Sequence, residues 1–153
     1  MILSIDQGTT GTTVLVLDRK ARVAASAYAE LPQHFPRPGW VEHDPREMLQ
    51  VTLRVIKRAL ANGRVRPSRV EAIGITNQRE TTILWDRRTG RPVANAIVWQ
   101  CRRTAPMCEQ LKARGHQPEF RRKTGLVLDA YFSGTKIRWL LDHVPGVRRR
   151  AQR

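Results

Sequence analysis

The sequence predicts an α/β domain built around a mixed sheet. Short apolar runs separated by turn residues open the chain, one long segment has apolar residues at helical spacing, and further apolar runs follow that segment. Strands first, a crossover helix and then more strands are the order typical of an α/β domain.

The first thirty residues alternate between apolar runs and turn chemistry. Residues 2–5 are typical of a short buried strand, and residues 8–11 of a tight turn. We therefore expect a returning strand over 12–17, a second turn over 18–20, and a third strand over 21–31.

One helix has signals at both ends. Asp44 occupies an N-cap position, Pro45 the first helical position and Glu47 the third, and apolar residues then recur at helical spacing as far as Leu60. The residues Asn62 and Gly63 predict its end.

Beyond this helix, apolar runs predict strands over 70–76, 81–85 and 93–99, with a hairpin turn over 86–91. The pattern then becomes helical, with helices expected over 104–114, 118–123 and 135–142.

Composition excludes several classes of protein. The chain has 153 residues, of which 41% are hydrophobic, and this excludes wholesale disorder, collagen and a disulfide scaffold. It contains neither the roughly 18 uninterrupted apolar residues of a membrane helix nor a secretory apolar region at its start. We expect a cytoplasmic protein, with Cys101 and Cys108 as free thiols.

The chain is strongly basic, with 28 Lys and Arg against 13 Asp and Glu, a formal charge of +15. Of these 28 basic residues 23 are arginine, and they are scattered apart from a cluster over 148–153. Because no nucleic-acid-binding motif or interleaved aromatic stripe accompanies them, we expect no specific nucleic-acid partner.

A phosphate-binding turn is the first candidate site. Gly8 and Gly11 allow close approach of the backbone, so amide N–H groups can hold phosphate oxygens, while Thr9 and Thr10 add hydroxyl donors. Asp6 at the preceding strand end suits Mg²⁺, which favours one or two carboxylates with phosphate oxygens. In the alternative interpretation this is an ordinary hairpin in which Asp6 bonds the amides of the turn.

The adjacent residues Arg79 and Glu80, between two apolar runs, are the second candidate site. If the chain bends there, a guanidinium and a carboxylate can both serve a polyhydroxyl ligand. The alternative is a surface salt bridge, which spacing alone favours. Trp99, Tyr131 and Phe132 are either core aromatics or an apolar wall for ligand C–H groups.

Five ordered blocks stand out along residues 1 to about 150. Two of them are Asn-Gln-Arg-Glu-Thr-Thr over 77–82 and Asn-Ala-Ile-Val-Trp-Gln-Cys-Arg-Arg over 95–103, and the other three begin at Asp6, Gly39 and Tyr131. Together the blocks closely resemble the glycerol kinases of the FGGY carbohydrate kinase family, and the first two are the most specific to them.

The resemblance implies an actin-like, ribonuclease H-like fold of two domains, with ATP and glycerol as substrates, ADP as a product, Mg²⁺ as cofactor and a homo-oligomeric enzyme. By position it assigns phosphate binding to Gly8, Thr9, Thr10 and Gly11, and Mg²⁺ to Asp6, through water. It assigns glycerol binding to Thr9, Arg79, Glu80, Trp99 and Tyr131.

Two departures from the family pattern accompany the resemblance. Thr13 stands where many relatives have Arg. The family's catalytic base, an Asp, and its adenosine-binding domain correspond to positions beyond Arg153. We therefore expect residues 1–153 to be the N-terminal part of the first kinase domain, inactive alone. The alternatives are a non-catalytic remnant that keeps the polyol site and, more remotely, a basic nucleic-acid-binding module.

Overall fold

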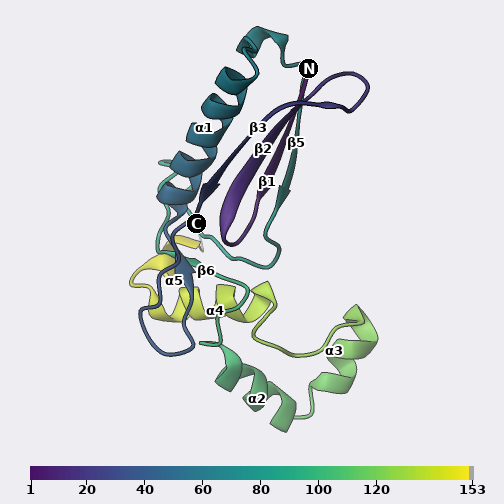
Figure 1. The fold of residues 1–153 in the computed structure, drawn as a ribbon. Coiled ribbons are helices and arrows are strands. Elements are labelled where there is room, and N and C mark those ends of the chain that lie inside the picture. Colours follow the sequence, from purple (N-terminus) through teal and green to yellow (C-terminus); the bar gives the residue numbers. More distant parts are fainter. Residues whose placement is uncertain (152–153) are drawn as a thin grey trace. The chain divides into compact units, whose positions relative to one another are not determined.

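The structure, a computed structural model, describes residues 1–151. Its internal contacts divide the chain into two compact units. Unit 1 comprises residues 1–33 and 44–79, and unit 2 comprises residues 34–43 and 80–153. Each unit is described by itself below (Figure 1).

Unit 1 contains a four-stranded mixed sheet of order β3-β2-β1-β5. β1 (Ile2–Gln7), β2 (Gly11–Leu17) and β3 (Val23–Glu30) form an antiparallel meander. β5 (Ala72–Asn77) lies parallel to β1, with Leu3 opposite Ile73 and Ile5 opposite Ile75. The mixed sheet and the turns at 8–11 and 18–20 confirm the prediction.

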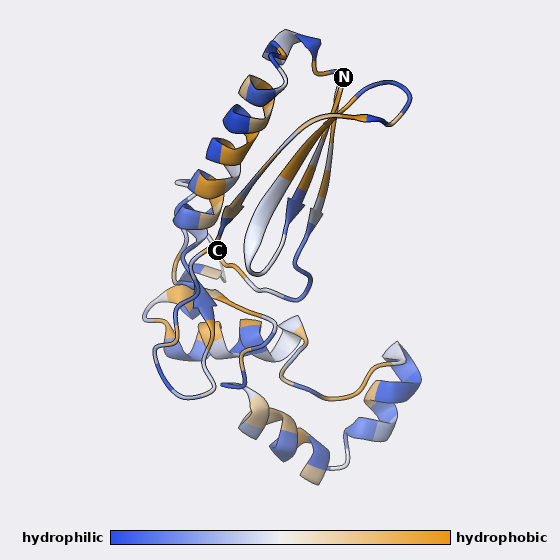
Figure 2. Ribbon diagram, viewed as in Figure 1, coloured by the Kyte–Doolittle hydropathy of each residue, from blue (hydrophilic) through white to orange (hydrophobic). Residues whose placement is uncertain are grey.

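α1 (Pro45–Asn62) is the crossover between β3 and β5, and it packs on β2 and β3. Its N-cap Asp44 accepts a hydrogen bond from the Arg46 N–H at 2.7 Å, as the capping pattern predicts. Figure 2 shows apolar positions recurring along this helix between hydrophilic ones. They bury Val51, Val55 and Ala59 against the apolar side chains of the first three strands, and these residues form the core of unit 1.

β5 is exposed along its whole length. Its isoleucines lie on the face of the sheet that α1 covers elsewhere, because Ile73 and Ile75 pair with the buried Leu3 and Ile5. They are nevertheless 58% and 70% exposed. β5 is also an edge strand of this sheet.

Unit 2 is mainly helical. Its short sheet pairs β4 (Glu42–His43) with β6 (Ala96–Ile97). α2 (Ala105–Ala113), α3 (Gln117–Thr124), α4 (Ser133–His143) and α5 (Val147–Ala151) follow in order. A small core forms around Ile97, Cys101 and Leu140.

Two of the predicted strands are wrong. Residues 81–85 form no strand and make only isolated bridges, Thr82 with Ile97 and Trp85 with Pro92. Of residues 93–99 only Ala96 and Ile97 are in a strand. The pairing between residues 81–85 and 92–97 does not extend into a regular ladder, because Pro92 has no N–H to donate and the chain bends at residues 93–94.

The helices after residue 100 lie where the spacing predicts them, within one or two residues at each end. Both cysteines are free and buried, as expected. α5 is an additional element within the basic cluster, whose last two residues, 152 and 153, lie outside the described part. None of the described helices is long and apolar enough to cross a membrane.

Candidate functional site

The predicted phosphate turn joins β1 to β2 in unit 1. The Gly8 N–H donates to the Gly11 carbonyl at 2.9 Å and closes the turn. Gln78 holds it from the end of β5, since its N–H donates to the Gln7 carbonyl at 2.8 Å and its side chain to the Gly8 carbonyl at 3.3 Å. Thr10 lies exposed at the tip, and among residues 1–151 no acceptor engages its N–H or hydroxyl. These donors are therefore available to a ligand.

Asp6 lies near the end of β1, on the face opposite α1, directly across from Thr13 of β2. Its carboxylate is exposed, and within the described chain no hydrogen bond or ion pair reaches it. The alternative in which Asp6 bonds the amides of the turn is therefore wrong. A carboxylate left without a partner beside a Gly-Thr turn fits a cation that is also held by phosphate oxygens.

Gly11 lies against the end of an exposed side chain. A Cβ atom there would lie 2.4 to 2.6 Å from the Tyr28 ring and hydroxyl, so this half-exposed ring would have to move. A Cβ at Gly8 would lie 3.1 Å from the Gly11 carbonyl oxygen. Both glycines thus permit close approach within the protein, and the assignment of their amides to phosphate stays a prediction.

The chain bends at Arg79 and Glu80, as the second candidate site requires. Glu80 has a φ of 62°, the left-handed conformation that non-glycine residues rarely adopt. Arg79 is exposed, and the described residues include no ion pair between Arg79 and Glu80. The surface salt bridge is therefore wrong.

Glu80 is instead held by the start of α4. Its Oε2 accepts hydrogen bonds from the Ser133 N–H at 2.8 Å and the Ser133 hydroxyl at 2.7 Å. A carboxylate at this position is also favoured by the helix dipole. No described group engages Oε1, so that oxygen remains an acceptor for a ligand hydroxyl.

The aromatic residues of the prediction come together in unit 2. The rings of Trp99 and Tyr131 meet edge to face with centroids 5.8 Å apart, and those of Tyr131 and Phe132 do so at 5.1 Å. The backbone N–H of Trp99 donates to the Thr81 hydroxyl at 3.3 Å, which ties this aromatic wall to the residue after Glu80. Trp99 and Tyr131 are half-buried, so one side of the wall remains accessible.

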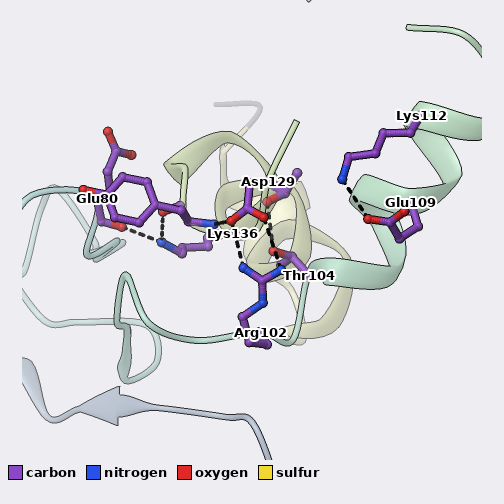
Figure 3. A network of polar contacts seen from close by, with 9 residues as sticks. Glu80, Arg102, Thr104, Glu109, Lys112, Asp129 and Lys136 are labelled. Atoms are coloured by element: carbon purple, nitrogen blue, oxygen red, sulfur yellow. Dashed lines mark hydrogen bonds and ion pairs between the residues drawn. The ribbon is translucent and has the colours of Figure 1, made fainter. Parts of the chain in front are cut away.

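Lys136 is a residue that sequence reasoning missed. It lies fully buried in α4 and donates to the backbone carbonyls of Glu80 at 2.8 Å and Tyr131 at 2.5 Å (Figure 3). Burial lowers the pKa of its ammonium from 10.5 to about 8. The available signal was a lysine four residues before Leu140, on the apolar side of the helix.

A second missed pair supports Tyr131. Arg102 donates two bonds to the Asp129 carboxylate, at 2.8 and 3.2 Å, and this carboxylate accepts the Tyr131 N–H at 2.8 Å. The Arg102 guanidinium accordingly lowers the pKa of Asp129. The backbone of Tyr131 is thus held at its N–H and at its carbonyl.

Unit 2 also contains a cavity of about 680 Å³ between α2, α3 and α4, lined mainly by apolar side chains such as Leu111 and Phe120. Of the predicted aromatic residues Phe132 contributes to its lining, whereas none of the residues assigned to phosphate, Mg²⁺ or glycerol does. Within residues 1–151 no group of three or more His, Cys, Asp or Glu side chains could hold a metal ion. A resident metal cage is therefore not present in the described chain, and Asp6 remains the candidate ligand.

Comparisons with known proteins show the family to which the chain belongs. Residues 1–153 match the profile described as "FGGY family of carbohydrate kinases, N-terminal domain". The chain is 58% identical over 151 residues to glycerol kinase of Symbiobacterium thermophilum, and 55% identical over 152 residues to glycerol kinase 2 of Thermotoga maritima. Each match covers 99% of this chain but only 30% and 31% of the relative.

Solved structures give the same result. Plasmodium falciparum glycerol kinase, solved with ADP, superposes with a TM-score of 0.92 at 35% identity over 99% of this chain and 30% of that one. A xylulose kinase of Rhodospirillum rubrum superposes with a TM-score of 0.84 at 25% identity, over 95% and 30%. The sequence spans about three tenths of the length of these relatives, and it belongs to the FGGY family of carbohydrate kinases, within their N-terminal domain.

Proposed function

We propose that this protein phosphorylates glycerol with ATP, and that residues 1–153 form the N-terminal part of the first domain of a two-domain, homo-oligomeric kinase. The identity of 55 to 58% to glycerol kinases over nearly the whole chain supports the activity. The observation that carries the proposal is the Glu80 carboxylate, which Ser133 orients with one oxygen unengaged, while one ammonium joins the Glu80 carbonyl to that of Tyr131.

In this proposal the polyol is held by a hydrogen-bond donor, a hydrogen-bond acceptor and an apolar surface. Arg79 donates and Glu80 accepts hydrogen bonds with glycerol hydroxyls, while Trp99 and Tyr131 contact the C–H groups. A site whose charged groups need hydroxyl partners discriminates by about 10⁴-fold against an analogue that lacks them.

The turn over 8–11 serves the nucleotide in this proposal. The N–H groups and hydroxyls of Thr9 and Thr10 would donate to phosphate oxygens, and Asp6 would hold Mg²⁺ through water. Mg²⁺ would supply charge neutralisation for the transferred phosphoryl group. Phosphoryl transfer depends mainly on such positioning and charge stabilisation, and the general base is contributed from outside residues 1–153.

The test measures glycerol 3-phosphate formation by the complete gene product and its Arg79→Ala and Glu80→Gln variants. We expect each variant to lose on the order of 2 kcal/mol or more of transition-state binding, about 30-fold in kcat/KM. Arg87→Ala is the matched control, because Arg87 is an exposed arginine in the 86–91 turn.

Two results would contradict the proposal. If the unmodified protein forms no glycerol 3-phosphate, the proposed activity is wrong, and the protein is a non-catalytic remnant or has another activity. If Arg79→Ala and Glu80→Gln both match Arg87→Ala, these residues are not in the polyol site.

A further inference from the structure

The feature that the proposed mechanism does not use is a buried positive charge. The Lys136 side chain is 0% exposed, and among the described residues no carboxylate lies within ion-pair distance of its ammonium. Burying a charge without a counter-ion is unfavourable, and its partners here are two backbone carbonyls. A leucine or methionine would fill this place on an amphipathic helix at lower cost, so stability alone does not account for a lysine.

The two carbonyls belong to the two residues that we assign to glycerol. One is the carbonyl of Glu80, whose left-handed backbone needs external support, with a φ of 62°. The other is the carbonyl of Tyr131. A single ammonium therefore fixes the bend at residue 80 against the loop that precedes α4.

Other contacts complete this support. Ser133 holds the Glu80 carboxylate, and Asp129 holds the Tyr131 N–H, while Arg102 clamps Asp129. With Lys136, each of the two residues is held at two points. The Lys136 ammonium is the group that Glu80 and Tyr131 share, because it donates a hydrogen bond to the backbone carbonyl of each.

We propose that Lys136 is a positioning residue for the polyol site: its ammonium sets the Glu80 carboxylate and the Tyr131 ring at the spacing that glycerol requires, without touching glycerol. This inference rests on the proposed function. It adds that glycerol affinity depends on the protonation of a group outside the ligand contacts.

The charged and titratable groups around Lys136 define the pH range. Desolvation lowers its pKa to about 8, against the opposing effects of Glu80, Cys101 and Asp129. Above that pH the neutral amine makes weaker bonds to carbonyls, because they are no longer charge-assisted. We therefore expect the KM for glycerol to rise above about pH 8 while the KM for ATP stays constant.

The first experiment compares Lys136→Met with Lys123→Met, an exposed lysine of α3 paired with Glu119. We expect Lys136→Met to raise the KM for glycerol at least tenfold and the KM for ATP less than twofold, with no change in Lys123→Met. A folded Lys136→Met protein with an unchanged KM for glycerol would overturn the proposal.

The second experiment needs neither activity nor a folded variant. Carbonyl ¹³C-tyrosine combined with ¹⁵N-phenylalanine labels the peptide bond between Tyr131 and Phe132, the one Tyr-Phe pair in residues 1–153. We expect this carbonyl signal to titrate with a midpoint near pH 8 in the unmodified protein. A carbonyl signal that does not move between pH 6.5 and 10 would overturn the positioning role, even if glycerol phosphorylation is established. A carbonyl signal that titrates in a protein without glycerol activity would instead reject the proposed function.

Discussion

Replacing Arg103 tests how unit 2 is held together. The Arg103 side chain is 2% exposed and donates to Glu42 Oε1 at 2.6 Å and to Cys101 Sγ at 3.0 Å. Its guanidinium also lies over the ring of Trp40 at 3.9 Å and that of Trp139 at 4.8 Å. We expect Arg103→Ala to be among the most destabilising single substitutions in this unit.

The expected magnitude follows from these contacts. Removing one partner of a buried ion pair costs about 3–5 kcal/mol, since it leaves the other charge buried and unpaired. Glu42 is 15% exposed and keeps a 2.9 Å bond from Asn95, which places the loss near the lower end of that range. Lost stacking on two tryptophans adds about 0.5–1 kcal/mol each. We therefore expect a loss of about 4 kcal/mol in the free energy of unfolding.

The assay is urea unfolding followed by tryptophan fluorescence. Arg138→Ala is the control, because that arginine forms an exposed pair with Asp142 within α4 and should cost about 0–1 kcal/mol. Glu42→Gln in the Arg103→Ala background should recover about 1–3 kcal/mol by removing the stranded charge. If Arg103→Ala costs no more than Arg138→Ala, the pair does not stabilise unit 2 and the reasoning is refuted.

Three further predictions concern stability. Val55 is 1% exposed, so Val55→Ala should lower the free energy of unfolding in urea by about 2 kcal/mol. Leu53→Ala, on the exposed side of α1, should lower it by less than about 0.5 kcal/mol, and equal losses in the two variants would contradict the packing of α1. Asp44→Ala should cost about 1 kcal/mol through loss of the N-cap bond, and Asp44→Asn should retain most of it; an unaffected Asp44→Ala protein would show that the cap is dispensable. Folding lowers the pKa of Lys136 from 10.5 to about 8, so the unfolded state binds more protons than the folded state between these pH values. The free energy of unfolding should therefore rise with pH over this range. The same rise in Lys136→Met would contradict this prediction.

The sequence predicts elements best where the signals are local. The N-cap at Asp44, the turn at residues 8–11 and the apolar spacing of α1 each lie within a few residues, and all three are confirmed. The strand predicted over 81–85 is wrong because a strand needs a continuous partner, and Thr82 finds only a single bridge, to Ile97. Pairing across fifteen residues is not encoded in local alternation.

The candidate site divides in the same way. The residue types at Asp6, Glu80 and Tyr131 indicate which chemistry is available, and the structure brings Glu80 close to Tyr131. Lys136 was missed, because its one signal, a lysine on an apolar helix face, contradicts the hydrophobic pattern by which buried positions are recognised. Its partners are backbone carbonyls, that of Tyr131 five residues away and that of Glu80 far away in sequence, and carbonyls leave no trace in the residue types.

The edge strand β5 has a consequence for the behaviour of the protein in solution. A strand that exposes its N–H and C=O groups together with Ile73 and Ile75 is a template on which another chain can add a strand. A formal charge of +15 opposes that encounter, because two copies repel each other before their edges meet. The repulsion extends only about 8 Å at physiological ionic strength and shortens as salt is added. Because added salt screens this repulsion, it should promote the self-association of a protein that consists of residues 1–153 alone.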